Sequence, residues 1–338
     1  PARCGRADPR RKMILEPFAP WLLLVALFAD ALIGDPPWLW RRIPHPVVVM
    51  GRLIGFLDNN LNRKTWPFAT RRVAGIIALL VVVSAGAGLG VVLQLLLSDS
   101  IPGKFAELLI VTVLLAQRSL YEHVAGVKQA FDDGGLPAAR MAVSRIVGRD
   151  PEALDGAGVC RAAIETTAEN FSDGIVAPAF WYLFAGLPGI LAYKAVNTAD
   201  SMIGHRSERY RAFGWAAARL DDLLNYVPAR ISGFLLAAAA PAVGGSAESA
   251  VRAMLRDASK HKSINAGWPE AAMAGALGLA LAGPRIYASG RVEDAWMNAF
   301  GRQGAKPSDI ASALRLLVAG CLAHALLVAV IGLVAQLL

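Results

Sequence analysis

Charge is scarce in this sequence. Asp, Glu, Lys and Arg make up 18% of the 338 residues, whereas ordinary soluble domains carry roughly 25%. Hydrophobic residues make up 55%, and the mean hydropathy is +0.45. The charge is missing from separate apolar runs, a distribution typical of membrane-embedded helices rather than of a soluble helical protein with a large core. We therefore predict an all-α, polytopic membrane protein.

Cysteine and the familiar phosphate-binding motifs are scarce as well. Cys4, Cys160 and Cys321 lie far apart and form no CxxC pair, which excludes a disulfide framework and a cysteine-rich zinc site. Cys160 is expected to be a buried bystander rather than a nucleophile. The chain has no GxxxxGK[ST] loop, no GxSxG elbow and no evident internal repeat. If the protein uses ATP, it does so without a familiar phosphate-binding loop.

The basic excess is unevenly distributed. The formal net charge is +8, and residues 1–12 hold five Arg or Lys against one Asp. We expect residues 1–12 to be a disordered or non-native tail and residues 13–338 to form a single integral membrane domain. Elsewhere basic and acidic residues are interleaved, which does not favour nucleic-acid binding. The lipid bilayer is the expected large partner.

Several apolar runs predict the membrane helices. The runs at 17–34, 73–97, 104–120 and 312–338 reach or approach the length that crosses a bilayer. Weaker apolar segments lie at 174–196, 229–245 and 270–283, of which the last is too short for an ordinary span. We expect about four to five spanning helices, together with short or re-entrant apolar helices.

Basic loops predict the topology. The segment 41–72 holds seven Arg or Lys and is therefore expected to be cytoplasmic. A hairpin over 73–120 would return the chain to that side, and 118–172 would form a cytoplasmic helical section. The segment 174–196 is interrupted by Gly186-Leu-Pro-Gly189, so it is either one kinked span or a re-entrant hairpin. We favour the hairpin, because it places the polar stretches on both sides of it together.

The stretch between Arg161 and Arg230 carries most of the candidate chemistry. Glu165 and Glu169 share a helical face, with Asn170 and Asp173 close by. Like charges at this spacing repel unless a cation lies between them, and oxygen ligands suit Mg²⁺. An Arg161–Glu165 ion pair followed by a cap on the next helix explains the same residues equally well.

A second acidic group follows at Asp221-Asp222-Leu-Leu-Asn225, with Asn197 and Asp200 upstream. Paired acids beside a membrane often hold Mg²⁺ against a phosphate. The alternative is a surface pair of Asp222 with a neighbouring arginine.

Basic residues between these groups suit phosphate. Arg206, Arg209 and Arg211 carry guanidinium groups that match phosphate oxygens in two-pronged contacts. They are also explained as ordinary juxtamembrane arginines. Lys194 is expected to extend to the membrane interface, with phosphate binding as the second interpretation.

These residues lie in strings that resemble the CbiB/CobD family, the adenosylcobinamide-phosphate synthases of cobalamin biosynthesis. The resemblance runs from about Met13 to the C-terminus. Its strings are DALIGDPPW (30–38), HPVVVMGRLI (45–54), SRIVGRD (144–150), RAAIETTAENFSDGIVAP (161–178), NTADSMIGHRSERYRAFGWAAARLDD (197–222) and NAGWPEAAMAGALG (265–278).

The resemblance implies an enzyme of the bacterial inner membrane, multi-pass, with its active site facing the cytoplasm. It would use ATP and Mg²⁺ to join adenosylcobyric acid to aminopropanol phosphate, or to the ethanolamine phosphate analogue. An association with other late corrinoid-pathway membrane enzymes also follows from it.

Roles for individual residues follow from combining this chemistry with the motifs. The predicted catalytic residues are Glu165, Glu169 and Asp173. The predicted metal ligands are Asp200, Asp221, Asp222 and Asn225. The predicted substrate- or phosphate-binding residues are Asp35, His45, Arg52, Asn170, Lys194, Asn197, Arg206, Arg209 and Arg211.

Two other functions remain open from the residues alone. A transporter with a carboxylate-lined site would also need buried acids and broken helices, although no inverted repeat is evident. A Mg²⁺-dependent intramembrane prenyltransferase would need two separated Asp-rich repeats, which the chain lacks.

Overall fold

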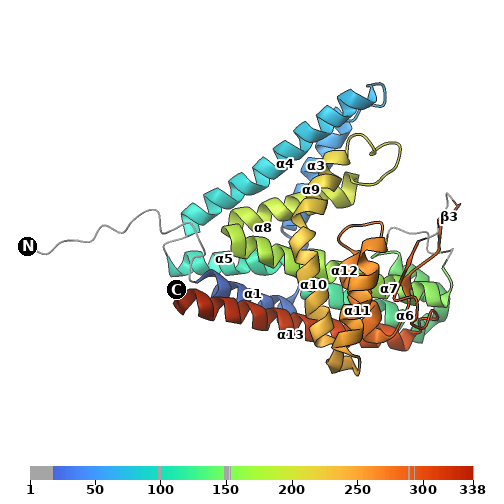
Figure 1. Cartoon of the computed structure of the whole chain (residues 1–338). Helices are drawn as coiled ribbons and strands as arrows, with labels where there is room; N and C mark the ends of the chain where they lie inside the picture. Colours follow the sequence, from blue (N-terminus) through green and yellow to red (C-terminus); the bar gives the residue numbers. More distant parts are fainter. Residues whose placement is uncertain are drawn as a thin grey trace, which may run out of the picture.

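The computed structural model describes residues 18–97, 100–147, 152, 154–287, 290–292 and 294–337. The tail expected at residues 1–12 lies outside these ranges. Helices make up nearly all of the regular structure (Figure 1). They are α1 (Ala19–Ile33), α2 (Pro37–Trp40), α3 (Pro46–Leu61), α4 (Phe68–Leu97), α5 (Ile101–Leu114), α6 (Gln117–Val143), α7 (Gly156–Phe171), α8 (Ala177–Ile203), α9 (Trp215–Leu224), α10 (Tyr226–Ala239), α11 (Ala247–Asp257), α12 (Gly267–Leu277) and α13 (Pro307–Leu337).

Shorter elements join these helices. A π-helical turn over Ser172–Val176 links α7 to α8, and 3₁₀ turns follow α10 (Ala240–Val243) and α11 (Ala258–Lys260). Four short strands lie between α12 and α13: β1 (Leu281–Ala282), β2 (Arg285–Tyr287), β3 (Gly290–Val292) and β4 (Trp296–Met297). They form two antiparallel pairs, β1 with β4 and β2 with β3. The all-α prediction is confirmed apart from these strands.

Five described helical segments are long and apolar enough to cross a membrane, which confirms the prediction of about four to five spans. They are Phe68–Leu97, Ile101–Val143, Gly156–Ile203, Tyr226–Val243 and Pro307–Leu337. The run predicted at 17–34 forms α1, a shorter apolar helix of 15 residues. The weak segment at 270–283 overlaps α12, which is buried along most of its length.

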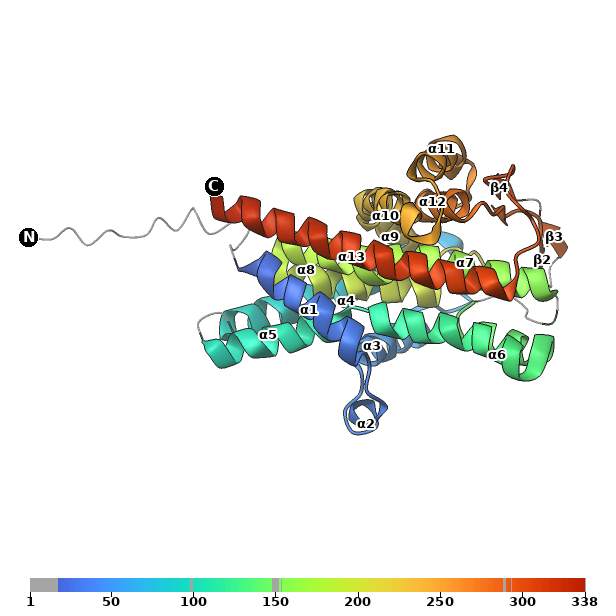
Figure 2. The same ribbon diagram turned by 90° about the horizontal axis from the view of Figure 1, so that it is seen from below.

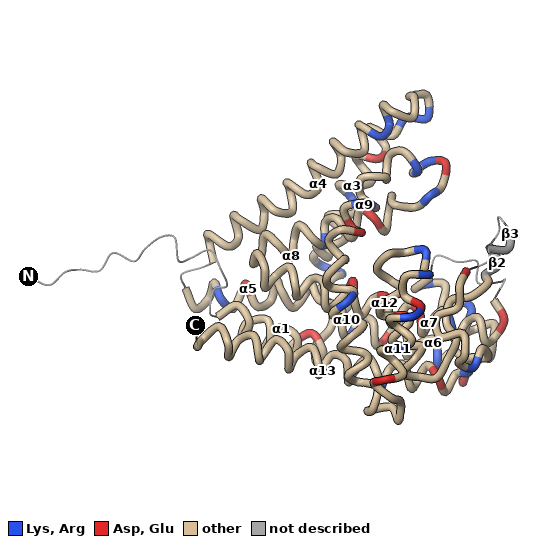
Figure 3. Tube along the Cα trace, in the orientation of Figure 1, with Lys and Arg blue, Asp and Glu red and all other residues tan. Residues whose placement is uncertain are grey.

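The helices form one main body with a second group leaning away from it. Helix α13 packs against α1, α6, α7 and α10 along the length of the molecule (Figure 2). Helix α4 diverges from α13 in Figure 1 and packs against α3, α8 and α9. This second group has its own core, which includes Ile54, Leu79 and Phe213. Most Lys, Arg, Asp and Glu residues lie towards one end of the molecule, leaving α1, α5 and most of α4 nearly free of charge (Figure 3).

Helix α8 folds back on itself. Gly186 adopts φ 61° and ψ −148°, a conformation almost restricted to glycine. The Tyr193 hydroxyl lies 3.0 Å from the backbone oxygen of Asp173, although 20 residues of straight helix would separate them by about 30 Å. The folded-back shape predicted for 174–196 is therefore confirmed, and both ends of this segment meet.

The same turn occurs in α6. Gly135 has φ 65° and ψ −155° and begins a second Gly-Leu-Pro sequence, like that at Gly186. Proline suits the first turn of the returning helix, where its missing N–H is not needed. Gly126 and Ala142 line one small pocket, which a straight helix would not allow. The tripeptide Gly-Leu-Pro therefore occurs at the turn of both helical hairpins.

Candidate functional site

Five acidic residues from four segments lie together. Asp173, in the π-helical turn, interacts electrostatically with Asp221, Glu169 and Asp200. Asp200, near the end of α8, interacts with Asp222 and Glu169. We call Glu169, Asp173, Asp200, Asp221 and Asp222 the acidic cluster. The two polar stretches that flank the α8 hairpin meet in it, as the sequence predicted.

Side-chain hydrogen bonds hold the cluster in place. The Tyr193 hydroxyl donates towards Asn225 Oδ1 at 2.9 Å. Asn225 Nδ2 donates to Asp221 Oδ2 at 2.9 Å, and Asn197 Nδ2 reaches Asp221 Oδ1 at 3.4 Å. Asn225 is buried, so its amide positions Asp221 between α8 and α9. Asn197 and Asn225 thus lie at the predicted site.

Burial, more than the crowding of negative charge, raises the pKa values of Asp221 and Asp222. Burial, followed by repulsion from Asp200, raises the pKa of Asp221 to about 7. Burial also raises the pKa of Asp222, against the opposing effect of Arg219 and Arg206. Carboxylates that cost this much to ionise would be stabilised by a cation placed between them.

Carboxylate and amide oxygens fit Mg²⁺ as ligands. Within the described residues, no three His, Cys, Asp or Glu side chains are arranged closely enough to enclose a metal ion. Mg²⁺ in phosphate-handling sites is usually held by one or two carboxylates, with water and substrate phosphates completing its octahedron. The donor set therefore fits a metal that is shared with a phosphorylated substrate.

Lys194 lies inside this region. The prediction that it extends to the membrane interface is wrong, because the side chain is buried. It interacts electrostatically with Asp173, Asp35 and Asp30, which draw the ammonium group inward. Asp35 in turn lies 3.5 Å from His45 Nε2. Asp35 thereby connects the segment between α1 and α2 to Lys194, and its substrate-binding role stays a prediction.

The three predicted phosphate-binding arginines are not equivalent. Arg209 Nη2 lies 2.6 Å from Asp58 Oδ2 on α3, and Arg211 lies over the ring of Phe68 at 5.6 Å. Arg206 is exposed and interacts electrostatically with Asp222. Only Arg206 is thus linked to the acidic cluster, whereas Arg209 fastens the loop after α8 to α3.

The remaining predicted residues have other surroundings. Glu165 is buried and its Oε1 accepts a hydrogen bond from the backbone N of Ala282 at 2.7 Å. Ala282 has φ 57°, so Glu165 holds an unfavourable backbone turn beside β1. Asn170 faces α6, where it lines a small pocket, and Arg52 is exposed on α3. Their catalytic or substrate-binding roles stay predictions.

Sequence reasoning missed two contributors. Tyr193 joins the arms of the hairpin to the acidic cluster, and no local sequence signal identifies it. Asp30 is buried in α1 and its Oδ2 accepts a hydrogen bond from the backbone N of Gln117 at 2.7 Å. Its place inside an apolar run was a visible signal, since a buried acid there needs a partner.

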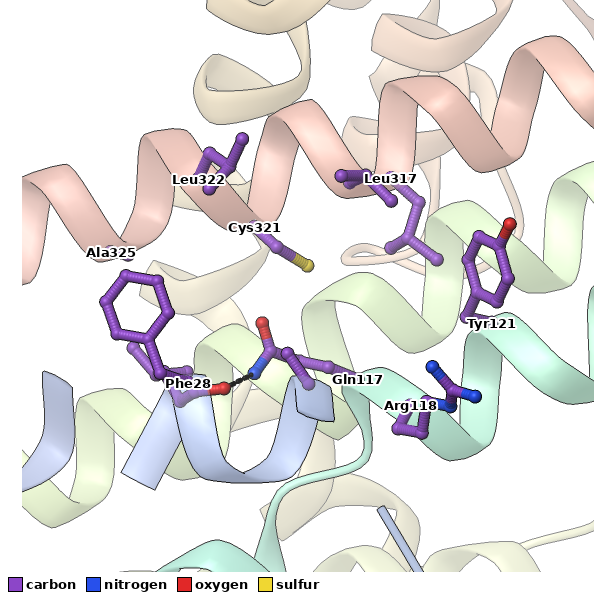
Figure 4. Close-up of a pocket in the computed structure, with 11 residues that line it drawn as sticks. Phe28, Gln117, Arg118, Tyr121, Leu317, Cys321, Leu322 and Ala325 are labelled. Atoms are coloured by element: carbon purple, nitrogen blue, oxygen red, sulfur yellow. Dashed lines mark hydrogen bonds between the residues drawn. The ribbon is translucent and has the colours of Figure 1, made fainter. Parts of the chain in front are cut away.

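An apolar cavity lies away from this site. It has a volume of about 350 Å³ and lies between α1, α6 and α13. Figure 4 shows Phe28, Cys321 and Leu322 around it, with Gln117 Nε2 hydrogen-bonded to the backbone oxygen of Leu27 at 2.7 Å. Its walls are mostly apolar side chains of α1 and α13, with Gln117, Arg118 and Tyr121 contributed by α6.

Comparison with known proteins gives consistent matches over most of the chain. A family model described as "CobD/Cbib protein" matches residues 23–317. The "Cobalamin biosynthesis protein CobD" of a Sinorhizobium species is 51% identical over 303 residues, which cover 89% of this chain and 94% of that protein. The proteins of the same name from Brucella suis and Rhodobacter capsulatus are 52% and 47% identical, each over 87% of this chain and 91% of the relative. No solved structure matches.

Proposed function

Because the chain belongs to the CobD/CbiB family of cobalamin biosynthesis proteins, we propose that it is an ATP-dependent ligase. It joins the free propionate carboxylate of adenosylcobyric acid to the amine of aminopropanol phosphate, or of ethanolamine phosphate, giving adenosylcobinamide phosphate. We place it in the bacterial inner membrane, with the site on the cytoplasmic side.

The acidic cluster is the observation that supports this reaction best. Amide formation needs an activated carboxylate, a neutral amine and neutralised phosphate charge. Asp200, Asp221 and Asp222 are suited to hold Mg²⁺, which would cancel charge on the phosphates of ATP. Lys194, buried beside Asp173 and Asp35, can bind an anionic oxygen of the substrate carboxylate or of a phosphate.

We propose that the reaction has two steps, activation of the carboxylate and attack by the amine. The propionate oxygen takes the γ-phosphoryl group of ATP, and ADP leaves. The amine nitrogen then attacks the acyl carbon, and inorganic phosphate leaves with the pair of electrons of the broken C–O bond. The amine proton passes to a carboxylate, for which Asp173 and Glu169 are the candidates at the edge of the cluster.

The direct test uses the purified protein in lipid nanodiscs with adenosylcobyric acid, aminopropanol phosphate and Mg-ATP. Adenosylcobinamide phosphate and ADP should appear together. Asp221→Asn should lower kcat by at least 100-fold, while Glu248→Gln, an exposed acid on α11, should leave it unchanged. Well-folded wild-type protein that forms no amide would refute the proposal. No described feature specifically favours the transporter or prenyltransferase alternatives.

A further inference from the structure

A small pocket without acids lies beside the acidic cluster. It has a volume of about 270 Å³ and is formed by α6, the residues that follow α6, and α7. Its polar lining residues are Ser119, His123, Arg145, Thr166 and Asn170. Arg145 is the one permanently charged residue among them. This pocket is therefore basic, whereas two further pockets that Arg145 also lines include Glu122 and Asp133.

The Arg145 guanidinium is uncommitted. Among the described residues it makes no side-chain hydrogen bond and no ion pair. Nearby arginines do: Arg140 Nε donates to the backbone oxygen of Leu154 at 2.8 Å, and Arg118 Nε lies 2.5 Å from Glu122. A guanidinium facing a pocket with its donors free can bind phosphate oxygens in a two-pronged contact.

The pocket and the acidic cluster are adjacent through α7. Asn170, which lines the pocket, directly follows Glu169 of the cluster. Ala116, also in the lining, packs against Gly174, where an added Cβ would lie 3.4 Å from the Ala116 Cβ. Asp173 immediately precedes this contact. A short molecule held at Arg145 would thus have the cluster within reach of its other end.

We propose that Arg145, with Ser119 and Asn170, binds the phosphate ester of the amine substrate. This inference rests on the proposed function and assigns the amine substrate a phosphate pocket separate from the metal-bound phosphates of ATP. The amine end then extends towards Glu169 and Asp173, the candidate proton acceptors. His123 Nδ1 lies 2.7 Å from the backbone oxygen of Ser119, which leaves Nε2 as a further donor when the ring is protonated.

The test compares two amines in wild-type protein and in Arg145→Gln. With aminopropanol phosphate, Arg145→Gln should lower kcat/KM roughly 10- to 100-fold, as expected for the loss of a charged hydrogen-bond pair. With unphosphorylated aminopropanol, kcat/KM should not change. Arg145→Lys should fall between, because it keeps the charge and loses the fork. Arg252→Gln, which removes an exposed arginine from α11, is the matched control.

Binding without turnover separates this inference from the proposed function. Calorimetric titration with aminopropanol phosphate, in the absence of ATP, should show weaker binding by Arg145→Gln than by wild type. If wild type makes no amide, the proposed function fails, and this titration alone decides the role of Arg145. Equal affinity, or retained preference for the phosphorylated amine, would overturn the inference. Should Arg145→Gln not fold, Ser119→Ala replaces it, and an unchanged affinity there would overturn the inference equally.

Discussion

The hydroxyl of Tyr193 lies 3.0 Å from the backbone oxygen of Asp173, although the two residues lie on opposite sides of the turn at Gly186. This contact connects the closing of the hairpin to the geometry of the acidic cluster. The same hydroxyl also meets Asn225, which positions Asp221. The Tyr193 hydroxyl therefore connects the hairpin to Asp173 and Asn225, and through Asn225 to Asp221.

Removing this hydroxyl should affect both stability and activity. Tyr193→Phe leaves buried acceptors without a donor, which costs about 1–3 kcal/mol, and it frees Asn225 to move. We expect a lower unfolding temperature and a reduced kcat. Tyr182→Phe is the matched control, because its hydroxyl donates to buried Glu107 Oε1 at 2.9 Å away from the cluster. A similar loss of kcat in both variants would show that Tyr193 acts on stability alone.

Alanine substitutions at the two hairpin glycines, Gly135 and Gly186, should destabilise the protein to different extents. At Gly186 an added Cβ would lie 2.4 Å from Gln94 Oε1, whereas at Gly135 it would meet nothing within 4 Å. Both positions carry the same backbone strain, about 1–3 kcal/mol for a side chain there. The Gly135→Ala protein should therefore lose stability through backbone strain alone. The Gly186→Ala protein should lose more, because its added Cβ also meets Gln94. Thermal unfolding in nanodiscs measures the difference, and a reversed order would contradict the geometry.

Stability of the metal-free protein should depend on pH through Asp221. Its folded-state pKa is about 7 against an ordinary 3.8, so between these values the folded protein holds a proton that the unfolded chain has lost. The contribution of this group is therefore greatest below about pH 4 and is lost as the pH rises through about 7. Asp221→Asn should flatten the pH dependence between about pH 4 and 8, the range that includes both pKa values.

Mg²⁺ should restore stability at the alkaline end of this range. At pH 8, added Mg²⁺ should raise the unfolding temperature of wild type, because an ion that binds only the folded state stabilises it. Asp221→Asn should respond less. Equal responses of the two proteins would remove Asp221 from the set of metal ligands.

Substitution of Arg209 should lower stability, whereas substitution of Arg206 should weaken ATP binding. Arg209→Gln removes the partner of buried Asp58 and should cost about 1–3 kcal/mol of stability, with little change in the KM for ATP. Arg206→Gln should leave the unfolding temperature unchanged and raise that KM. The measurements are unfolding curves and steady-state kinetics of the two variants. An increased KM for ATP in Arg209→Gln at full stability would restore its predicted phosphate contact.

The placement of the site on one side of the membrane can be tested by labelling. In protein with its native cysteines replaced by serine, Ser144→Cys and Ser201→Cys place exposed thiols before α7 and near the end of α8, on either side of the hairpin. Both should react with a membrane-impermeant maleimide in inside-out vesicles and not in right-side-out vesicles. Reaction of the two cysteines from opposite sides would contradict the re-entrant arrangement.

Local sequence signals predicted the parts of the fold that depend on neighbouring residues. The Gly186-Leu-Pro-Gly189 break identified the hairpin because glycine and proline act on their own backbone. The identical Gly-Leu-Pro at Gly135 carried the same signal. It was not used, because the surrounding residues 118–172 were predicted as one cytoplasmic helical section. The strands around Ala282 were not predicted, since pairs of two or three residues depend on contacts such as that with Glu165.

Partners distant in the sequence decided which candidate residues meet. Arg209 pairs with Asp58, 151 positions earlier, and nothing near either residue indicates the other. Lys194 was assigned to the interface from its position at the end of an apolar run, but acids from α1 and the first loop draw it inside. The acidic residues themselves were predictable because their positions flank the hairpin, which brings its own ends together.

The α8 hairpin also bears on how the chain is inserted. A segment that returns to the side from which it entered leaves the parity of membrane crossings unchanged. In the re-entrant arrangement, the orientation of α10 and α13 would be set by the helices before α7, and a longer or shorter hairpin tip would not invert the helices that follow it. A change in tip length would then alter how far the hairpin enters the bilayer while the rest of the protein keeps its orientation.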